Sequence, residues 1–521
     1  MKVVVAETMQ KAERLTMESY RIPGQVLMET AGRACAAHVD AEYGPGPEKF
    51  AVIVAGKGNN GGDGYVIARC LQRTGWTVSV FVIAEKDSIV GDAEKNLSLL
   101  DPSIVRYCPE SGDLLPFRTD FLSASIIIDA LFGIGSTKDV SGVYAEAVRM
   151  INLPGKPVVA VDIPSGIDAS SGRVLGVAVK ADVTVTFAFA KLGHVVYPGR
   201  AYTGKLVTAD IGLPLEVAAA AEYFDYLDSE TVGTFLKFRD RTGHKGSYGH
   251  CLIIAGSTGK TGAAALSANS AVRAGSGLVT LAVPASLNPI LEVKTTESMT
   301  LPLDDCGKGH LGEENFAAIL QAVCGKDAVA LGPGISSTLG TVALVQRLVR
   351  DCSVPMVLDA DGLNAIADDV SILLQKKSPA IVLTPHPGEM SRLTGLSIAC
   401  IERDRIAAAR DFAVRYSVYL VLKGAGTVVA APDGSIAING SGNPGMASGG
   451  MGDVLTGIIV SLLGQGYPTR EACRLGVFLH GHAADLVARE KGEIGITATD
   501  VQDRLPYAYQ NIREAVNHKG E

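Results

Sequence analysis

The stretch GKGNNGGDG, residues 56–64, decides the fold of the first half of the chain. It follows the apolar run AVIVAG at residues 51–56 and precedes a helical pattern, so it connects a strand to a helix. Gly56, Gly58 and Gly61 match the G-x-G-x-x-G spacing of a dinucleotide-binding turn, in which small residues let the backbone approach a pyrophosphate. The stretch therefore indicates the first strand and helix of a Rossmann-like unit.

Three polar residues distinguish this loop from the plain fingerprint. Asn59, Asn60 and Asp63 are not required by it, and a carboxylate at the start of a helix repels a pyrophosphate bound there. These residues either bind a ligand of another kind, or they form the turn and cap the helix. Both interpretations stay open on the loop alone.

Short apolar runs rich in β-branched residues alternate with helical patterns along the rest of the chain. Buried strands of a parallel sheet have this composition, and the alternation predicts doubly wound α/β folds. Two helices, at residues 7–18 and 23–41, precede the first strand. The predicted strands of the first half lie in residues 51–56, 76–83, 125–133 and 157–166. Those of the second half lie in residues 250–257, 278–284, 327–334, 355–362, 380–389 and 418–427.

The segment PLEVAAAAEYF, residues 214–224, is predicted to connect the two halves. A chain of 521 residues is too long for one ordinary domain. The halves show no internal repeat, so we expect two different α/β domains, 1–220 and 221–521.

Composition and charge exclude several classes of protein. The net charge of −8 argues against nucleic acid or an anionic membrane as the main partner. The nine cysteines contain no CxxC pair, which argues against a zinc ribbon or a disulfide framework. The N-terminus lacks the pattern of a secretory signal, and the apolar stretch at 455–463 is too short to cross a bilayer. We therefore expect a soluble, cytoplasmic protein.

Polar residues also follow two later strands of the first half. Asp129 ends the run IIID, and the glycine loop 133–136 follows it. Asp162, Ser165 and Asp168 come in VDIPSGID, directly after the next strand. Ligands of open α/β sheets bind outside the carboxyl ends of the strands, and such oxygen-bearing side chains suit a hard cation and a polyhydroxy ligand.

GKGNNGGDG, DALFGIGS and DIPSGID together resemble the N-terminal domain of the NAD(P)HX epimerase family, over about residues 1–215; NAD(P)HX is hydrated NAD(P)H. The resemblance implies that Asn60, Asp129 and Ser165 bind a potassium ion. It implies that Asp162 contacts the nicotinamide end of the substrate and acts as the acid–base residue. The residues that it places around NAD(P)HX are Asn59, Asn60, Gly61, Gly62, Asp63, Gly133, Ile134, Gly135, Ser136, Thr137, Lys138, Asp139 and Asp162.

In the second half, NPGMASGGMGD at residues 443–453 leads directly into an apolar helical pattern. Small residues let backbone N–H groups approach a phosphate, and the helix dipole stabilises the anion. Asp453 is placed to take a proton from an attacking hydroxyl. A glycine loop followed by Asp is typical of ribokinase-like enzymes; the alternative is a helix cap with a solvated Asp453.

Two further motifs of this half are rejected as sites. GSTGKT at residues 256–261 has two residues between its first Gly and GK where a P-loop needs four. His480 and His482 are two apart in a helical pattern and therefore face different sides of the helix. We predict that both histidines are packing residues and not a metal pair.

The strings AGSTGKTGA, GPG, TPHPGE, LKGAGT and NPGMASGGMGD together resemble the ADP- or ATP-dependent NAD(P)HX dehydratase family, a ribokinase-like α/β fold, over about residues 230–510. By that resemblance Ala263, Gly334, His386 and Asp453 face NAD(P)HX. The residues implied to hold the nucleotide are Lys423, Gly424, Ala425, Gly426, Thr427, Asn443, Pro444, Gly445, Met446, Ala447, Ser448, Gly449, Gly450, Met451 and Gly452.

The two resemblances imply a bifunctional repair enzyme that uses K⁺, Mg²⁺ and ADP or ATP, has NADHX and NADPHX as substrates, and forms a homo-oligomer. The implied dehydration phosphorylates the hydroxyl of NAD(P)HX and then eliminates phosphate. A small-molecule kinase that shares the second fold is a rival interpretation, and it would make a stable phosphorylated alcohol. A nucleotide-binding scaffold without catalysis and a plain NAD dehydrogenase are two further interpretations of the sequence.

Overall fold

The computed structural model describes residues 1–45, 48–153 and 155–517. These residues form two compact units. One comprises Lys2–Phe224, and the other comprises Met1 and the chain from Asp225 onward. The sequence places the boundary at residues 220 and 221, within the segment 214–224. In the structure that segment contains the short helix α9 (Leu215–Ala220).

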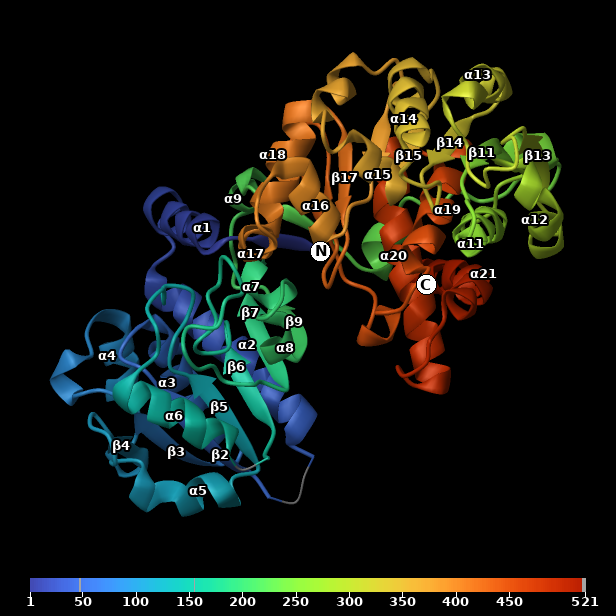
Figure 1. The fold of residues 1–521 in the computed structure, drawn as a ribbon. Helices are drawn as coiled ribbons and strands as arrows, with labels where there is room; N and C mark the ends of the chain where they lie inside the picture. The colour runs from blue at the N-terminus through green and yellow to red at the C-terminus, as the bar shows by residue number, and fades with distance from the viewer. Residues whose placement is uncertain (46–47, 154, 518–521) are drawn as a thin grey trace. The chain divides into compact units, whose positions relative to one another are not determined.

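The N-terminal unit is built on a seven-stranded sheet in which every neighbouring pair of strands is parallel (Figure 1). The strands, in their order across the sheet, are β4 (Val105–Tyr107), β3 (Thr77–Val82), β2 (Phe50–Ala55), β5 (Ile126–Ala130), β6 (Val158–Val161), β7 (Val183–Phe187) and β9 (Lys205–Ala209). The order reverses between β2 and β5, as in a Rossmann fold. Two further short strands, β1 (Lys2–Val4) and β8 (Ala190–Lys191), pair with each other in parallel.

Both faces of this sheet are buried. In β2, Ala51 and Ile53 belong to one hydrophobic cluster, whereas Val52 and Val54 belong to the cluster on the opposite face. Two-sided burial explains why the strands are continuous apolar runs, as the sequence predicts. The helices of the unit are α1 (Ala6–Ser19), α2 (Gly24–Tyr43), α3 (Asn59–Arg73), α4 (Gly91–Ser98), α5 (Arg118–Ser123), α6 (Gly142–Asn152), α7 (Leu192–Val195), α8 (Arg200–Thr203) and α9.

The C-terminal unit has a different sheet, with a parallel part followed by an antiparallel part. The parallel strands, in order, are β13 (Met299–Leu303), β12 (Leu278–Pro284), β11 (His250–Ile254), β14 (Ala328–Leu331), β15 (Met356–Leu358), β16 (Ile381–Leu383) and β17 (Tyr419–Leu422). β17, β18 (Val428–Ala430) and β19 (Ile436–Asn439) are antiparallel, and β10 (Phe224–Leu227) follows β19. Here the strand order reverses between β11 and β14.

Helices cover this second sheet and bury one large hydrophobic cluster. They are α10 (Ser229–Gly233), α11 (Thr261–Arg273), α12 (Asn288–Lys294), α13 (Phe316–Val323), α14 (Leu339–Asp351), α15 (Asp361–Ile366), α16 (Pro387–Thr394), α17 (Ile398–Arg403), α18 (Arg405–Tyr416), α19 (Met451–Gly464), α20 (Thr469–Lys491) and α21 (Ala498–Asn517). α19 packs against α11 and against β11, β14 and β15. The apolar stretch 455–463 is therefore a core helix.

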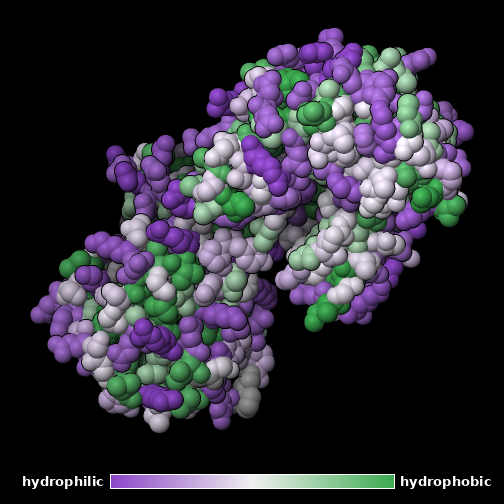
Figure 2. Space-filling model, viewed as in Figure 1, coloured by the Kyte–Doolittle hydropathy of each residue, from purple (hydrophilic) through white to green (hydrophobic). Residues whose placement is uncertain are grey.

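The fold class is the one predicted, and each predicted strand overlaps an observed one. Several observed strands have no counterpart in the prediction, including β7, β9, β13, β18 and β19. Hydrophilic residues cover most of the visible face of each unit, with hydrophobic residues scattered between them (Figure 2). Within the described ranges, no helix combines the length and the apolar character that crossing a bilayer requires.

The packing of α19 on α11 depends on a glycine. A Cβ on Gly457 would lie 2.3 Å from the carbonyl oxygen of Ser267 and 2.6 Å from Cβ of Ser270, both in α11. We expect Gly457→Ala to lower the free energy of unfolding by about 1–3 kcal/mol, because the two backbones must separate. Gly262→Ala is the matched control, since a Cβ there meets nothing within 4 Å. Thermal unfolding measures both; equal midpoints for the two variants would contradict this packing.

Candidate active sites

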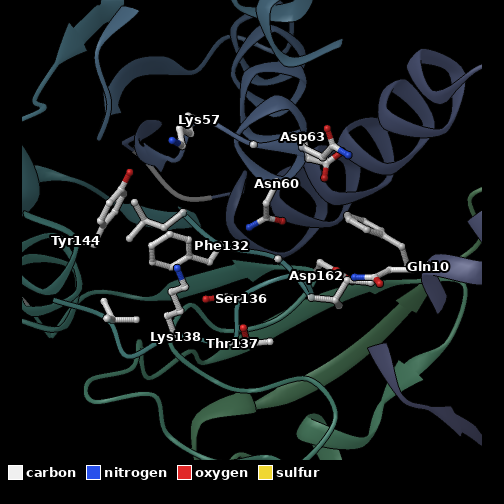
Figure 3. A pocket seen from close by; sticks show the side chains of 18 of the residues that line it. Gln10, Lys57, Asn60, Asp63, Phe132, Ser136, Thr137, Lys138, Tyr144 and Asp162 are labelled. Atoms are coloured by element: carbon white, nitrogen blue, oxygen red, sulfur yellow. The ribbon is translucent and has the colours of Figure 1, made fainter. Parts of the chain in front are cut away.

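The N-terminal unit contains a cavity of about 730 Å³ at the carboxyl edge of its sheet. The cavity lies where the strand order reverses between β2 and β5, the position at which open α/β sheets bind ligands. Its walls come from the start of α3, the loop after β5, the end of β6 and one side of α1 (Figure 3).

The cavity brings together every residue predicted to surround the substrate except Gly61 and Gly62. The predicted residues that line it are Asn59, Asn60, Asp63, Gly133, Ile134, Gly135, Ser136, Thr137, Lys138, Asp139 and Asp162. Gly61 and Gly62 are buried in the first turn of α3. A Cβ on Gly61 would lie 1.9 Å from the carbonyl oxygen of Gly56, so this glycine allows the turn to close.

A buried ion pair holds Asp162 at the cavity wall. Nζ of Lys191 lies 2.6 Å from Oδ1 of Asp162, and it also donates to the hydroxyl of Thr186 at 2.9 Å. Thr186 in turn donates to the same carboxylate oxygen of Asp162 at 3.1 Å. Asp162 has a φ of 66°, a left-handed conformation that is uncommon outside glycine. The ammonium of Lys191 is fully buried, so it compensates this carboxylate without screening by water.

Two more carboxyl groups line the same cavity. Burial raises the pKa of Glu13 to about 7; repulsion from Asp162 adds to this effect, and Lys191 opposes it. Burial, with repulsion from Asp162 and Glu13, raises the pKa of Asp63 well above its usual range. Three carboxyl groups thus share one ammonium, and two of them hold protons more tightly than carboxyl groups in water do.

The cavity has an acidic end and a basic end. Figure 3 shows Gln10, Asp63 and Asp162 at one end and Lys57 and Lys138 at the other. Ammonium groups bind phosphate, whereas a carboxylate next to a protonated carboxyl group can exchange protons with a ligand. The cavity therefore suits an elongated ligand with phosphates at one end and a reactive ring at the other.

Of the three predicted potassium ligands, Asn60 lines the cavity, whereas Asp129 and Ser165 are buried and are not part of its lining. Asp129 at the end of β5 is fully buried, and burial raises its pKa to about 6 against the effect of hydrogen bonds from Ser165. Ser165 donates its hydroxyl to Asp129 at 2.6 Å and its backbone N–H at 2.8 Å. The carboxamide of Asn60 lies against Gly133, and neither of its buried polar atoms has a hydrogen-bond partner among the described residues. A buried carboxylate and an unpartnered carboxamide oxygen are donors that fit a hard cation.

The C-terminal unit gathers its predicted site at the carboxyl edge of its parallel strands. Gly334 follows β14, His386 follows β16 and Lys423 follows β17, while Ala263 lies in the first turn of α11 after β11. Asp453 lies in the first turn of α19, which packs on β11, β14 and β15. These five residues come from five separate segments of the sequence and meet at one edge of the sheet.

Asp453 has carboxyl neighbours that change its acidity. Burial raises the pKa of Asp453 to about 7; Asp359, Asp361 and Glu389 repel its negative form, and Lys423 opposes them. A carboxyl group with this pKa can accept a proton from a hydroxyl at neutral pH and release it again. A raised pKa of this kind suits Asp453 to the predicted role of general base.

Lys423 pairs with the carboxylates beside Asp453. Its Nζ lies 2.8 Å from Oδ1 of Asp359 and 3.7 Å from Oε2 of Glu389, and Thr456 donates to the other oxygen of Asp359 at 2.8 Å. Burial acts to lower the pKa of Lys423, but Asp359 and Glu389 outweigh it and raise this pKa. A Cβ on Gly452 would lie 3.2 Å from this ammonium, so a larger side chain there would crowd it.

Ala263 and Gly334 adjoin each other beside a second lysine. Gly334 has a φ of 60°, and a Cβ on it would lie 2.8 Å from Cβ of Lys260 and 3.2 Å from Cβ of Ala263. Nζ of Lys260 lies 2.8 Å from Oδ2 of Asp361. The rejected P-loop motif thus contains a lysine that pairs with Asp361, a carboxylate whose charge also acts on Asp453.

His386 has a structural role, which is the alternative to a ligand-binding role for a single histidine of this kind. Nδ1 of the ring accepts the backbone N–H of Gly388 at 3.0 Å and that of Glu389 at 3.4 Å. The backbone N–H of His386 donates to Oε2 of Glu389 at 2.8 Å. These bonds form a capping box at the start of α16. The ring is half exposed, so it can still face a ligand.

The predicted nucleotide residues lie in two segments: 423–427, between β17 and β18, and 443–452, which follows β19 and includes the first two residues of α19. Asp485 holds the second loop, because its carboxylate accepts the N–H of Gly442 and the side-chain amide of Asn443, both at 2.9 Å. A Cβ on Gly449 would meet nothing within 4 Å, so the backbone there borders open space. The loop thus has the open backbone that a phosphate requires.

His480 and His482 both pack inside the unit, the role predicted for them. Burial lowers the pKa of His480 to about 4, and His482 stacks on Phe478 with ring centroids 5.5 Å apart. Over the part of the chain that the structure describes, no group of three His, Cys, Asp or Glu side chains is placed to hold a metal ion.

Sequence reasoning misses four charged residues of the two sites. Glu13 and Lys191 lie on elements that carry no recognisable motif. Asp359 directly follows β15. The rule that ligands bind beyond the carboxyl ends of parallel strands, which we call the strand-end rule and which finds Asp129, also applies to Asp359. Glu389 stands in TPHPGE, where only the histidine is singled out.

Two family models match the chain, one within each of its two units. The family described as YjeF-related protein N-terminus matches residues 24–193, and the family described as NAD(P)H-hydrate dehydratase matches residues 251–507. The chain is 43% identical to the bifunctional NAD(P)H-hydrate repair enzyme Nnr of Moorella thermoacetica, over 99% of this chain and 98% of that protein. It is 39% identical to the protein of the same name from Thermofilum pendens, over 99% and 97%. A crystal structure of an ADP/ATP-dependent NAD(P)H-hydrate dehydratase from Bacillus subtilis is 29% identical, covers 56% of this chain and 99% of its own, and has a TM-score of 0.48.

The ion pair between Lys191 and Asp162 gives a prediction for stability. Lys191→Met leaves a buried carboxylate uncompensated, so we expect the N-terminal unit to lose about 3–5 kcal/mol of its free energy of unfolding. Calorimetry of the variant measures this loss. The double variant Lys191→Met, Asp162→Asn removes both charges and should be the more stable of the two. If both are destabilised equally, Lys191 acts through its packing alone.

Proposed function

The chain belongs to the family of bifunctional NAD(P)H-hydrate repair enzymes, and we propose that it catalyses both steps of this repair. Its N-terminal unit interconverts the R and S epimers of NADHX and NADPHX. Its C-terminal unit dehydrates the S epimer to NADH or NADPH with ADP or ATP as phosphoryl donor. One observation carries the proposal: in each matched segment a carboxyl group, Asp162 or Asp453, lies beside the switch point of its own sheet, where it can meet a ligand.

Epimerisation requires little more than placed proton acceptors and donors. Hydration of the dihydronicotinamide ring leaves a hydroxyl on C6, next to the ring nitrogen, and this hemiaminal carbon inverts when the ring opens and recloses. Asp162 supplies the proton acceptor, because its carboxylate lines the cavity and is held by Lys191 and Thr186. Lys57 and Lys138 at the basic end bind the phosphates of the dinucleotide.

Asn60, Asp129 and Ser165 are the residues that would hold potassium. The fit rests on the unpartnered carboxamide of Asn60 and the buried carboxylate of Asp129. A bound K⁺ would compensate the negative charge of the buried Asp129 carboxylate. Asp129 and Ser165 also position the cavity wall, because the hydroxyl of Ser165 accepts the backbone N–H of Phe132 at 3.0 Å.

Dehydration begins at Asp453, which removes the proton of the C6 hydroxyl. The oxygen attacks the terminal phosphate of ADP or ATP, and the backbone N–H groups of residues 449–452 at the start of α19 stabilise the charge that develops. Phosphate then leaves with its bonding electrons as the ring nitrogen forms a double bond to C6. Loss of a proton from C5 restores the dihydropyridine. Phosphorylation converts a poor leaving group into a good one.

Magnesium is the metal that this phosphoryl transfer calls for. Mg²⁺ is usually held by one or two carboxylates together with substrate phosphates, and the oxygens of Asp361 and Glu389 beside Asp453 fit that arrangement. Bound there, Mg²⁺ would neutralise charge on the phosphates.

The proposed function extends to the oligomeric state, the compartment and the partners of the chain. We infer a homo-oligomer that works in the cytoplasm, with small molecules and no nucleic acid as partners. All nine cysteines are free, which suits a reducing compartment, and the net charge of −8 disfavours nucleic acid.

Asp453→Asn tests the dehydratase. With S-NADHX, Mg²⁺ and ADP or ATP, the wild-type chain should form NADH and release phosphate, and the variant should lose at least about 100-fold in kcat because an amide accepts no proton. Absorbance of dihydronicotinamide and a phosphate assay measure both products. The wild-type rate should rise with pH through about 7, because Asp453 works as the carboxylate and its pKa is raised to that value.

The control for this experiment is Asp503→Asn, an exposed aspartate of the same unit, which should behave as wild type. Asp162→Asn should also dehydrate the S epimer normally but leave R-NADHX unconverted. A stable phosphorylated alcohol in place of NADH would identify a small-molecule kinase and overturn the proposed dehydration.

Potassium should stabilise the N-terminal unit through Asn60. At a few times its Kd, K⁺ should add about 1 kcal/mol to the free energy of unfolding of this unit, and tetramethylammonium should not. Asn60→Ala should abolish the effect with little other loss, since the carboxamide has no protein partner. Asn59→Ala, one residue away, should keep it. Thermal unfolding in the two salts measures the shift; an unchanged K⁺ effect in Asn60→Ala would place the ion elsewhere.

A further inference from the structure

The helix α1 contributes a carboxyl group to the N-terminal site that the proposed function leaves unused. α1 buries Met9, Ala12 and Thr16. Gln10 and Glu13, one turn apart, line the same cavity as Asp162. The helix is therefore part of the cavity wall, and Glu13 is half-buried on it.

The charges around Glu13 come from three elements of the unit. Asp63 comes from α3, Asp162 from the end of β6 and Lys191 from β8. The helix α9 also packs on α1, but its titratable residue, Glu216, is exposed. The ammonium of Lys191 bonds directly to Asp162 and acts on Glu13 only through space. The cavity wall thus contains the carboxylate of Asp162, which is paired with an ammonium, and the carboxyl group of Glu13, which has no such direct partner among the described residues.

We propose that Glu13 is a second catalytic residue of the epimerisation, the proton donor that works with Asp162 as proton acceptor. The inference rests on the proposed function of the N-terminal unit. It adds a residue from a helix that precedes the sheet, and it assigns opposite tasks to two carboxyl groups on the wall of one cavity.

The ring-opening step balances with these two residues alone. Asp162 takes the proton of the C6 hydroxyl, the electron pair of that O–H bond forms the carbonyl of an aldehyde, and the bond between C6 and N1 breaks. The electron pair of the broken bond stays on N1, which takes the proton of Glu13. After rotation about the bond between C5 and C6, N1 attacks the other face of the aldehyde. Glu13 regains its proton from N1, and Asp162 returns its proton to the oxygen, so both residues end in their starting forms.

Asp63 lines the same cavity but suits the donor role less well. It is the more deeply buried of the two residues, in the second turn of α3. Burial raises the pKa of Glu13 to about 7, which is where a group gives and regains a proton most readily at neutral pH. Burial, with repulsion from Asp162 and Glu13, raises the pKa of Asp63 well above its usual range, so this group gives up its proton less readily.

Glu13→Gln tests the proposal in the full chain. Pure R-NADHX is incubated with enzyme and K⁺ but without nucleotide, so that the dehydratase is idle, and S-NADHX is followed by chromatography. We expect kcat to fall at least about 100-fold with KM within threefold of wild type, because glutamine keeps the shape but carries no transferable proton. The matched control is Glu18→Gln, the same change at an exposed position of the same helix, which should behave as wild type.

The pH profile separates a proton donor from a structural residue. The wild-type kcat should fall as pH rises through about 7, where Glu13 loses its proton, and Glu13→Gln should lack this inflection. A variant with more than a tenth of the wild-type kcat, or one that keeps the inflection, would overturn the proposal. If Glu13→Gln does not fold, the pH dependence of the wild-type kcat tests the proposal. The absence of an inflection between pH 6 and 8 would exclude Glu13 as the proton donor. A wild-type chain that does not epimerise at all would instead contradict the proposed function.

Discussion

In each unit a lysine ammonium pairs with one carboxylate at the candidate site while further carboxyl groups lie nearby. Lys191 does so in the N-terminal unit and Lys423 in the C-terminal unit. A protein interior cannot hold several uncompensated carboxylates, so one group takes the ammonium and the others hold protons more tightly. Glu13 and Asp453 both have pKa values near 7 for this reason. Burial, together with repulsion between neighbouring carboxylates, thus produces carboxyl groups that can exchange protons at neutral pH without a histidine.

The parallel sheets explain how so many charged side chains meet. All strands of a parallel sheet end at the same edge, and the residue after each strand is free to point into the space beyond. Asp162 follows β6, Asp359 follows β15 and Lys423 follows β17. In both units the helix that begins at the switch point, or packs over it, adds a glycine-rich first turn, which lets backbone N–H groups approach a ligand. The same architecture therefore serves two different reactions with different side chains.

The strand-end rule also marks what sequence reasoning can predict. It places Asp129, Asp162 and the loops around them correctly, because strand and turn patterns are local. Glu13 is different: α1 precedes the sheet, and only tertiary packing brings it to the cavity. Lys191 stands in an apolar stretch and is buried because Asp162 compensates it, a contact that no local pattern records. The sequence predicts that His386 faces the substrate, and the structure adds that its Nδ1 caps α16, a role usually taken by Ser, Thr, Asp or Asn.

The proposed reactions make opposite demands on the same hydroxyl group. Epimerisation must return the oxygen to C6, so a donor and an acceptor that exchange protons are sufficient, and the cavity of the N-terminal unit offers such a pair in Glu13 and Asp162. Dehydration must discard the oxygen, and hydroxide is too poor a leaving group for proton transfer alone. The phosphate loop therefore belongs with Asp453, which can turn the hydroxyl into a nucleophile toward a phosphate bound at the start of α19. A single site that contained both the proton-exchanging pair and the phosphate loop would phosphorylate either epimer that it bound. Separate units let the first stay indifferent to configuration while the second selects one epimer.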